Sequence, residues 1–201
     1  MKKNKLSLLL STAVLITSSF VTVSNASEWQ LNPSQSQLNF ISIKKSHVAE
    51  VHKFTDIQGQ LTEQGQFYLA IDLASVDTNI EIRNERMKTH LFEIEQFATA
   101  NLTATIDLEK VDAIAEGASA AMIIDAELDL HGFKQPVSLD LIVTRLVGAK
   151  ISVVSSQPIL VRADDFSLVA GINKLRDLAK LPSIGYTVPV SFYLIFNHKQ
   201  K

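Results

Sequence analysis

The sequence predicts an all-β fold of roughly eight antiparallel strands, closed into a barrel or packed as a sandwich, with two short helices in the connections. Three observations support this prediction. Apolar and polar residues alternate with period two over most of the chain, as in strands with one buried face. Only two segments change to helical spacing, and no Ser-, Gly- or Pro-rich linker divides the chain. One domain is therefore expected, and closing the sheet would hide its edges most economically.

The clearest strand is expected over residues 66–74, where Phe67, Leu69, Ile71 and Leu73 fall on one side. The same alternation predicts further strands with the apolar faces Leu102, Ala104, Ile106 and Leu108; Ile124, Ala126, Leu128 and Leu130; Val137, Leu139, Leu141 and Val143; and Val188, Val190, Phe192, Leu194 and Phe196. Between the second and third of these faces, the polar segment 131–134 predicts a hairpin turn. Weaker alternation marks strands at 36–44, 48–62 and 150–161.

Helical spacing first occurs over residues 79–95. Its residues at intervals of three and four are Arg83, Arg86, Met87, His90, Leu91 and Ile94. Thr78 and Asn79 are the expected N-cap residues, with Glu81 close behind. The second helix is expected over 172–181, between Gly171 and Pro182.

Composition excludes several classes of function. The apolar fraction of 46% and charged fraction of 20% are those of a globular chain, and the net charge of −2 supplies no basic field for nucleic acid. The absence of cysteine excludes disulfides, thiolate metal sites, thiol nucleophiles and lipidation of a terminal cysteine. Nucleic acid is not an expected partner.

Residues 1–26 are interpreted as a secretory signal peptide. Lys2, Lys3 and Lys5 precede an apolar stretch at 6–16, and the residues up to Ala26 match the small-x-small cleavage pattern. A membrane anchor is disfavoured, because a spanning helix needs about 20 apolar residues and hydroxyl residues interrupt this stretch at 17–19. We expect the mature chain, 27–201, to be a soluble periplasmic barrel domain.

Four motifs then give the chain a resemblance to the YceI-like family. SVDTN at 75–79 with IRNERM at 82–87 and HLF at 90–92 resembles the family's S-x-x-T-x(n)-R-x-x-x-L-F segment. QFATANL at 96–102 is similar to an aromatic-Pro-x-Ala-x-Phe stretch, with Ala98 for Pro and Leu102 for Phe. LDLHGFKQPV at 128–137 resembles a hairpin L-x-L-x-G-x-x-x-P-V, and ADDFSL at 163–168 with the run 175–190 resembles the C-terminal part of one subgroup. The resemblance spans about 29–196.

The resemblance implies an exported, lipocalin-like barrel of eight antiparallel strands whose interior takes a long apolar molecule, in some members a polyisoprenoid chain such as a quinone tail. For this chain we expect a polyisoprenoid, a quinone or a fatty-acid-like lipid. A barrel of this size encloses either its own side chains or one small ligand. Alternation together with barrel closure selects these candidate lining residues: Phe67, Leu69, Ile71, Leu73, Leu128, Leu130, Leu139, Leu141, Phe192 and Leu194. Apart from such a bound isoprenoid lipid or quinone, no cofactor is expected.

The first helix leaves two questions open. Met87 and Leu91 belong either to a lid over an apolar cavity or to ordinary core. Arg83 and Arg86 either bind a polar head group at the barrel mouth or form a surface ion-pair lattice with neighbouring glutamates.

Other chemistry has weaker support. The five histidines do not converge into a metal site and are interpreted as surface or turn residues, and Asp125, Glu127 and Asp129 as the solvated face of a strand. No nucleophile elbow or phosphate loop is present, so no catalytic residues are assigned. The main expectation is a non-enzymatic carrier or sequestering protein for a lipid. The alternative is an envelope or stress-related interaction protein with a packed barrel, and a homodimer stays open for either.

Overall fold

The computed structural model describes residues 27–199, which form twelve β-strands and three α-helices. The strands are β1 Ser27–Leu31, β2 Gln37–Lys44, β3 Val48–Phe54, β4 Ile57–Thr62, β5 Gln66–Asp72, β6 Val76–Asp77, β7 Thr99–Thr105, β8 Ser119–Leu130, β9 Phe133–Leu146, β10 Lys150–Ser155, β11 Ile159–Arg162 and β12 Thr187–His198. The helices are α1 Glu81–Met87, α2 Leu108–Asp112 and α3 Val169–Leu178. Short 3-10 turns lie at Pro33–Gln35, Leu73–Ser75 and Ala163–Phe166, and a π-helical turn at Lys88–Phe92 extends α1.

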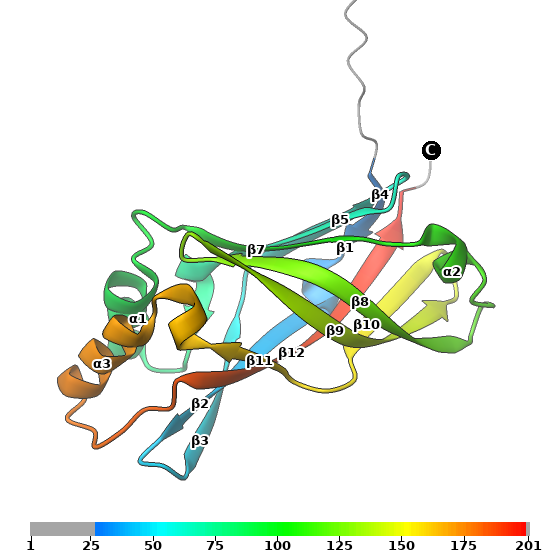
Figure 1. Cartoon of the computed structure of the whole chain (residues 1–201). Coiled ribbons are helices and arrows are strands. Elements are labelled where there is room, and N and C mark those ends of the chain that lie inside the picture. The colour runs from blue at the N-terminus through cyan, green and yellow to red at the C-terminus, as the bar shows by residue number, and fades with distance from the viewer. Residues whose placement is uncertain (1–26, 200–201) are drawn as a thin grey trace, which may run out of the picture.

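Eight of the strands close into an antiparallel barrel in the order β1-β4-β5-β7-β8-β9-β10-β12, because β12 pairs back with β1. The predicted all-β fold, with an eight-stranded antiparallel barrel, is confirmed. The two halves of the long strand β12 pair with different strands. Its C-terminal half pairs with β1 and β10, and its N-terminal half pairs with β2 and β11. The barrel is thereby lengthened toward the end where α1 and α3 lie, and α2 lies at the opposite end (Figure 1).

The hairpin between β8 and β9 turns through only two residues, His131 and Gly132, since Leu130 already pairs with Phe133. Both turn residues have positive φ, 54° and 78°, as the favoured two-residue turn requires. The predicted turn at 131–134 therefore stands in the right place but is two residues too long.

Several predicted boundaries are wrong. The candidate 48–62 is two strands, β3 and β4, with different partners, and 150–161 is likewise β10 and β11. The strand predicted to include Leu108 ends at Thr105, because the Asp107 carboxylate accepts the Glu109 N–H and starts α2. The strand expected over 66–74 ends at Asp72, where its side chain caps the 3-10 turn that follows. β1 was not predicted.

The two predicted helices exist with different limits. Helical hydrogen bonding begins at Glu81 rather than at residue 79, because Asn79 has φ of 59° and Ile80 occupies the N-cap position without a side-chain bond. The second helix runs over Val169–Leu178, so Gly171 lies inside it instead of before it. The predicted signal peptide lies outside the described residues.

Candidate functional site

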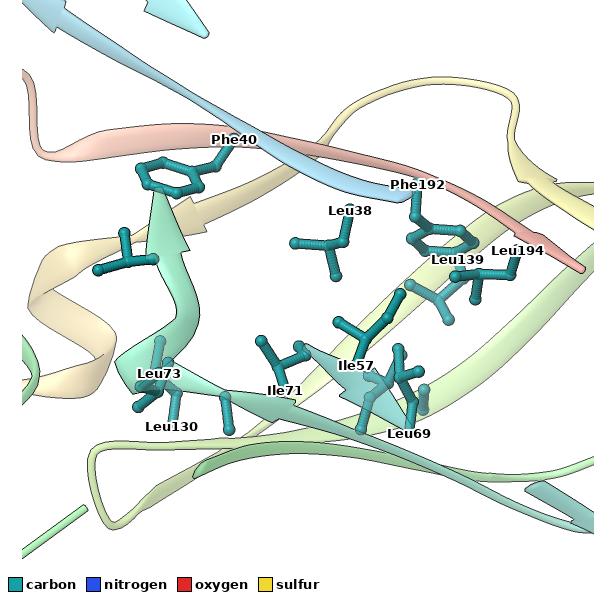
Figure 2. Close-up of a cluster of buried hydrophobic side chains, with 14 of the residues drawn as sticks. Leu38, Phe40, Ile57, Leu69, Ile71, Leu73, Leu130, Leu139, Phe192 and Leu194 are labelled. Atoms are coloured by element: carbon teal, nitrogen blue, oxygen red, sulfur yellow. The ribbon is translucent and has the colours of Figure 1, made fainter. Parts of the chain in front are cut away.

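The barrel interior is the candidate site, and apolar side chains from nearly every strand fill it (Figure 2). Alternate residues of each strand point inward, so the period-two pattern of the sequence becomes a continuous apolar lining. These side chains do not fill the barrel interior completely. They leave two cavities whose walls expose only apolar atoms.

The first cavity, of about 60 Å³, lies toward the α2 end. Its lining comprises Leu61, Phe67, Leu102, Ala104, Ile106, Val111, Met122, Ile124, Leu139, Leu141, Val143, Ile151, Val153, Phe192, Leu194 and Phe196. Val111 enters this wall from α2, which shows that the short helix belongs to the closure of the barrel and not only to a surface loop.

The second cavity, of about 150 Å³, lies toward the end that carries α1 and α3. Its lining comprises Leu38, Phe40, Phe54, Ile71, Leu73, Met87, Leu91, Phe92, Ala100, Leu128, Leu130, Val161, Ala163, Leu168, Ile172, Val188 and Val190. An apolar cavity of about this volume holds a benzene-sized molecule in other proteins.

The order of residues along single strands shows how the two cavities are arranged. On β5, Phe67 lines the first cavity, Ile71 lines the second, and Leu69 between them lines neither. On β8, Ala126 occupies the same intermediate position between Ile124 and Leu128. The cavities therefore follow one another along the barrel axis, separated by a partition, which we define as the buried residues Ile57, Leu69 and Ala126.

Leu69 fills the partition because its neighbour across the strand pair has no side chain. Gly59 on β4 is opposite Leu69, and a Cβ atom at Gly59 would lie 3.3 Å from Leu69 Cδ1 and 3.4 Å from a ring carbon of Phe196. Leu69 itself is only 1% exposed. Figure 2 shows Leu69 and Ile57 between the side chains of Leu139 and Leu194 on one side and Leu73 and Leu130 on the other.

Except for Leu69, every predicted lining residue contributes to a cavity wall. Five line the first cavity, namely Phe67, Leu139, Leu141, Phe192 and Leu194, and six line the second, namely Ile71, Leu73, Met87, Leu91, Leu128 and Leu130. Met87 and Leu91 belong to both of the predicted descriptions, since they are buried core residues that also close the second cavity. Whether a ligand touches these residues stays a prediction.

The second cavity is closed at its end by α3, which packs closely against the π-helical turn. We call these two segments the helical cap. A Cβ atom at Gly171 would lie 2.6 Å from His90 O and 2.9 Å from Leu91 Cα, so only glycine permits this approach. Ile172, the next residue of α3, is buried and lines the cavity. The missed residues Phe40, Phe54 and Ile172 could have been found only by knowing which weak strands and helix faces meet here.

The predicted head-group arginines make bonds within the protein. Arg83 Nη1 donates to Glu50 Oε2 at 2.9 Å and Nη2 donates to Thr78 O at 2.7 Å, while Lys44 Nζ lies 2.7 Å from the same Glu50 oxygen. Hydrogen bonding by Lys44 and Arg83 holds the pKa of Glu50 below its usual range against the opposing effect of burial. The expected pairing of Arg83 with a neighbouring helix glutamate is wrong, because its partner lies on β3.

Arg86 Nη1 lies 3.5 Å from Leu178 O at the end of α3 and ties the two helices together. Neither arginine lines either apolar cavity. Their predicted contact with a head group is not tested by these bonds and stays a prediction.

Two histidines are buried, and one of them, His52 on β3, corrects the interpretation of all five as surface or turn residues. His52 is 4% exposed, its Nε2 lies 2.8 Å from Ser42 Oγ, and burial lowers the pKa of its imidazole. His131 occupies the hairpin turn as expected, yet it is only 8% exposed. Its ring nitrogens lie 2.9 Å from Glu93 Oε2 and 3.2 Å from Phe166 O, so His131 joins the hairpin to the two segments that flank the helical cap.

Within residues 27–199, no group of three or more His, Cys, Asp or Glu side chains is arranged to hold a metal ion. The same residues include no helix that is long and apolar enough to span a membrane. The strand carboxylates Asp125 and Glu127 are exposed, as predicted, and Glu127 pairs with Lys134 at 2.8 Å.

Comparison with known proteins places these features among relatives. A model of the YceI-like domain matches residues 29–196. A polyisoprenoid-binding domain from Saccharophagus degradans, implicated in plant cell wall breakdown, is 40% identical, with 87% of this chain and 100% of that chain covered and a TM-score of 0.85.

More distant solved structures share the fold. BcnA of Burkholderia cenocepacia is 16% identical over 82% of this chain and 98% of its own, with a TM-score of 0.63. The YceI protein of Campylobacter jejuni is 12% identical over 94% of this chain and 100% of its own, with a TM-score of 0.57. No curated protein sequence matches the chain.

Proposed function

The chain belongs to the YceI-like domain family, and from this premise we propose that it is a non-enzymatic carrier or sequestering protein for a lipid with a long apolar tail. One observation supports this function above all others. The barrel interior contains two successive cavities with only apolar walls, so a chain without polar groups is the molecule that they can accept without leaving a buried polar atom unpaired.

The Saccharophagus degradans relative supports the class of ligand, because it is a polyisoprenoid-binding domain. We propose a polyisoprenoid, a quinone tail or a fatty-acid-like chain for this protein. Burial of each methylene contributes about 0.8 kcal/mol, so tail length should determine affinity more than head-group chemistry does.

The volumes of the cavities add a condition to this proposal. Ligand pockets commonly occupy about 300–1,000 Å³, whereas the voids here are about 60 and 150 Å³. A long tail must therefore displace the partition residues and occupy both cavities at once. The same small volumes favour the alternative function, an interaction protein whose packed barrel takes no ligand.

We propose a periplasmic site of action, which rests on the signal-peptide pattern of residues 1–26. Export would bring the barrel into contact with the membrane surfaces where long-tailed lipids are found.

A series of single-tail lipids with one head group and increasing tail length tests the function. Each added methylene should tighten binding by up to about fourfold until the interior is full. Binding stabilises the folded state by mass action, so the melting temperature should rise along the series. A melting temperature that stays unchanged with every tail length would support the packed-barrel alternative.

A further inference from the structure

The outer wall of the barrel has a groove of about 510 Å³. One side of the groove is the C-terminal end of β7 together with α2, and the other side is the N-terminal half of β8. Residues 105–107, Lys110 and residues 121–125 line it. Figure 1 shows β7 and β8 side by side near the end that carries α1 and α3, and diverging toward α2 at the other end. This groove is distinct from the two interior cavities and from the helical cap.

The groove exists because β7 leaves the sheet before β8 does. β7 pairs with β8 only from Asn101 to Ala104, whereas β8 pairs with β9 along its whole length, from Leu130 to Ser119. After Thr105 the chain turns away, since Ile106 N–H donates to Gly65 O at 2.7 Å and Asp107 begins α2. Residues 119–125 of β8 therefore have no strand on their β7 side.

The β8–β9 hairpin shows which backbone groups of β8 face the groove. With Leu130 and Phe133 as the hydrogen-bonded pair next to a two-residue turn, alternate residues of β8 bond to β9. The intervening residues Ala121, Ile123 and Asp125 direct their N–H and C=O groups toward β7, where no strand partner lies. Over this stretch the wall is not closed by backbone hydrogen bonds.

Side chains close it instead. Ile106, Met122 and Ile124 line both the outer groove and the first interior cavity, so they form one layer between the outside and the apolar interior. Rotating these side chains requires no parting of paired strands, and methionine is the most adaptable apolar side chain. At the other end, α3 packs on His90 and Leu91 so closely that even one methyl group at Gly171 does not fit.

We propose that this gap in the strand ladder is a lateral portal, through which the apolar tail passes between β7 and β8 while the lipid's head group stays in the groove. The proposal rests on the carrier function proposed above. Asp107 pairs with Lys110 at 3.5 Å, which leaves the exposed Asp125 carboxylate as the net charge of the groove. An uncharged, hydrogen-bonding head group fits the free strand edge and that charge better than an anionic one does.

Reversible bridging of the groove tests the portal. Because the chain contains no cysteine, the double variant Lys110→Cys/Ile123→Cys introduces a unique pair, on two exposed side chains, for a short disulfide-forming cross-linker. A matched control, Thr89→Cys/Lys174→Cys, bridges the π-helical turn and α3, where both side chains are exposed and line one cleft. The measurement is the association rate of a fluorescent single-tail probe with an uncharged head group.

Bridging the groove should slow association by about tenfold or more, and reduction should restore it. Bridging the helical cap should leave the rate unchanged. If the cap bridge slows association and the groove bridge does not, the portal is overturned while the carrier function stands. If the unbridged variants and the original chain all fail to bind any probe of the length series, the carrier function is overturned and the portal with it.

Discussion

Leu69 on β5 lies opposite Gly59 on β4, and its side chain occupies the space that a side chain at position 59 would need. This pair places an apolar partition across an otherwise continuous apolar interior. The relationship gives the barrel two small cavities instead of one long one. It also gives the most direct means of changing which tails the protein accepts.

We expect Leu69→Ala to join the two cavities. The folded state should lose about 2–5 kcal/mol, as for other buried leucines, and binding should keep strengthening to longer tails before it saturates. Leu73→Ala is the matched control, because Leu73 is equally buried at 1% but already lines the second cavity. Urea unfolding and the tail-length series measure both effects. The same saturation length in both variants would mean that Leu69 does not separate the cavities.

The hairpin turn at Gly132 allows a test with an internal reference. Gly132 and Gly148 both have positive φ, 78° and 81°. A Cβ atom at position 132 would lie 2.9 Å from a ring carbon of Phe97, whereas a Cβ atom at position 148 would have no neighbouring atom within 4 Å. Gly148→Ala should cost about 1 kcal/mol from backbone strain alone. Gly132→Ala should cost more, measured as the free energy of unfolding. Equal losses would show that Phe97 moves aside freely.

Packing of the helical cap is tested by Gly171→Ala. Alanine favours a helix interior over glycine by about 1 kcal/mol, so an isolated helix would gain stability. Here the added methyl group would meet His90 O and Leu91 Cα, and we expect a net loss of about 1–3 kcal/mol. The exposed neighbour Lys174→Ala should change the melting temperature little. A gain in stability for Gly171→Ala would show that α3 is not held against the π-helical turn.

Stability should fall as the pH drops through 6.5, the ordinary pKa of histidine, because of His52. Burial lowers the pKa of its imidazole, and the nearby Arg83 guanidinium acts in the same direction, while Glu50 and Asp77 oppose it and Lys44 adds to it. The unfolded state therefore binds the proton at a higher pH than the folded state does, and protonation favours unfolding. The effect fades as the pH rises above 6.5.

Chemical unfolding of the original chain and of His52→Gln measures this effect. The pH range should stay above 4.5, since Glu50 has a lowered pKa and its own stabilising contribution is lost only below its ordinary value. The variant should show a flatter dependence between pH 7 and about 5. His47→Gln, on an exposed turn residue, should keep the original slope. An unchanged slope in His52→Gln would assign the pH dependence to other groups.

The inward faces of the strands could be predicted from the sequence because alternation is a local property. Phe67, Ile71, Leu139 and Leu194 point into the interior for the same reason that their polar neighbours point out. Breaks without Gly or Pro could not be found in this way. Thr55 and Asp56 interrupt the run 48–62, although its alternation continues on both sides of them. Only the pairing of β3 with β2 and of β4 with β5 shows that the run is two strands.

Properties that depend on distant contacts were beyond the sequence pattern. Leu69 looks like any other inward residue of β5, and its role as a partition follows from Gly59 and Phe196. His131 is buried because Glu93 and Phe166 approach it from other segments. Arg83 bonds to a glutamate on β3 instead of one on its own helix, which no helical spacing rule would indicate.

Native mass spectrometry of the protein isolated from its own cells shows whether the barrel carries a long apolar tail. We expect a stoichiometric mass addition that is lost on organic extraction, with a long-chain lipid in the extract. A clean mass of the protein alone, together with no rise in melting temperature on adding polyprenols, quinones or fatty acids, would contradict it.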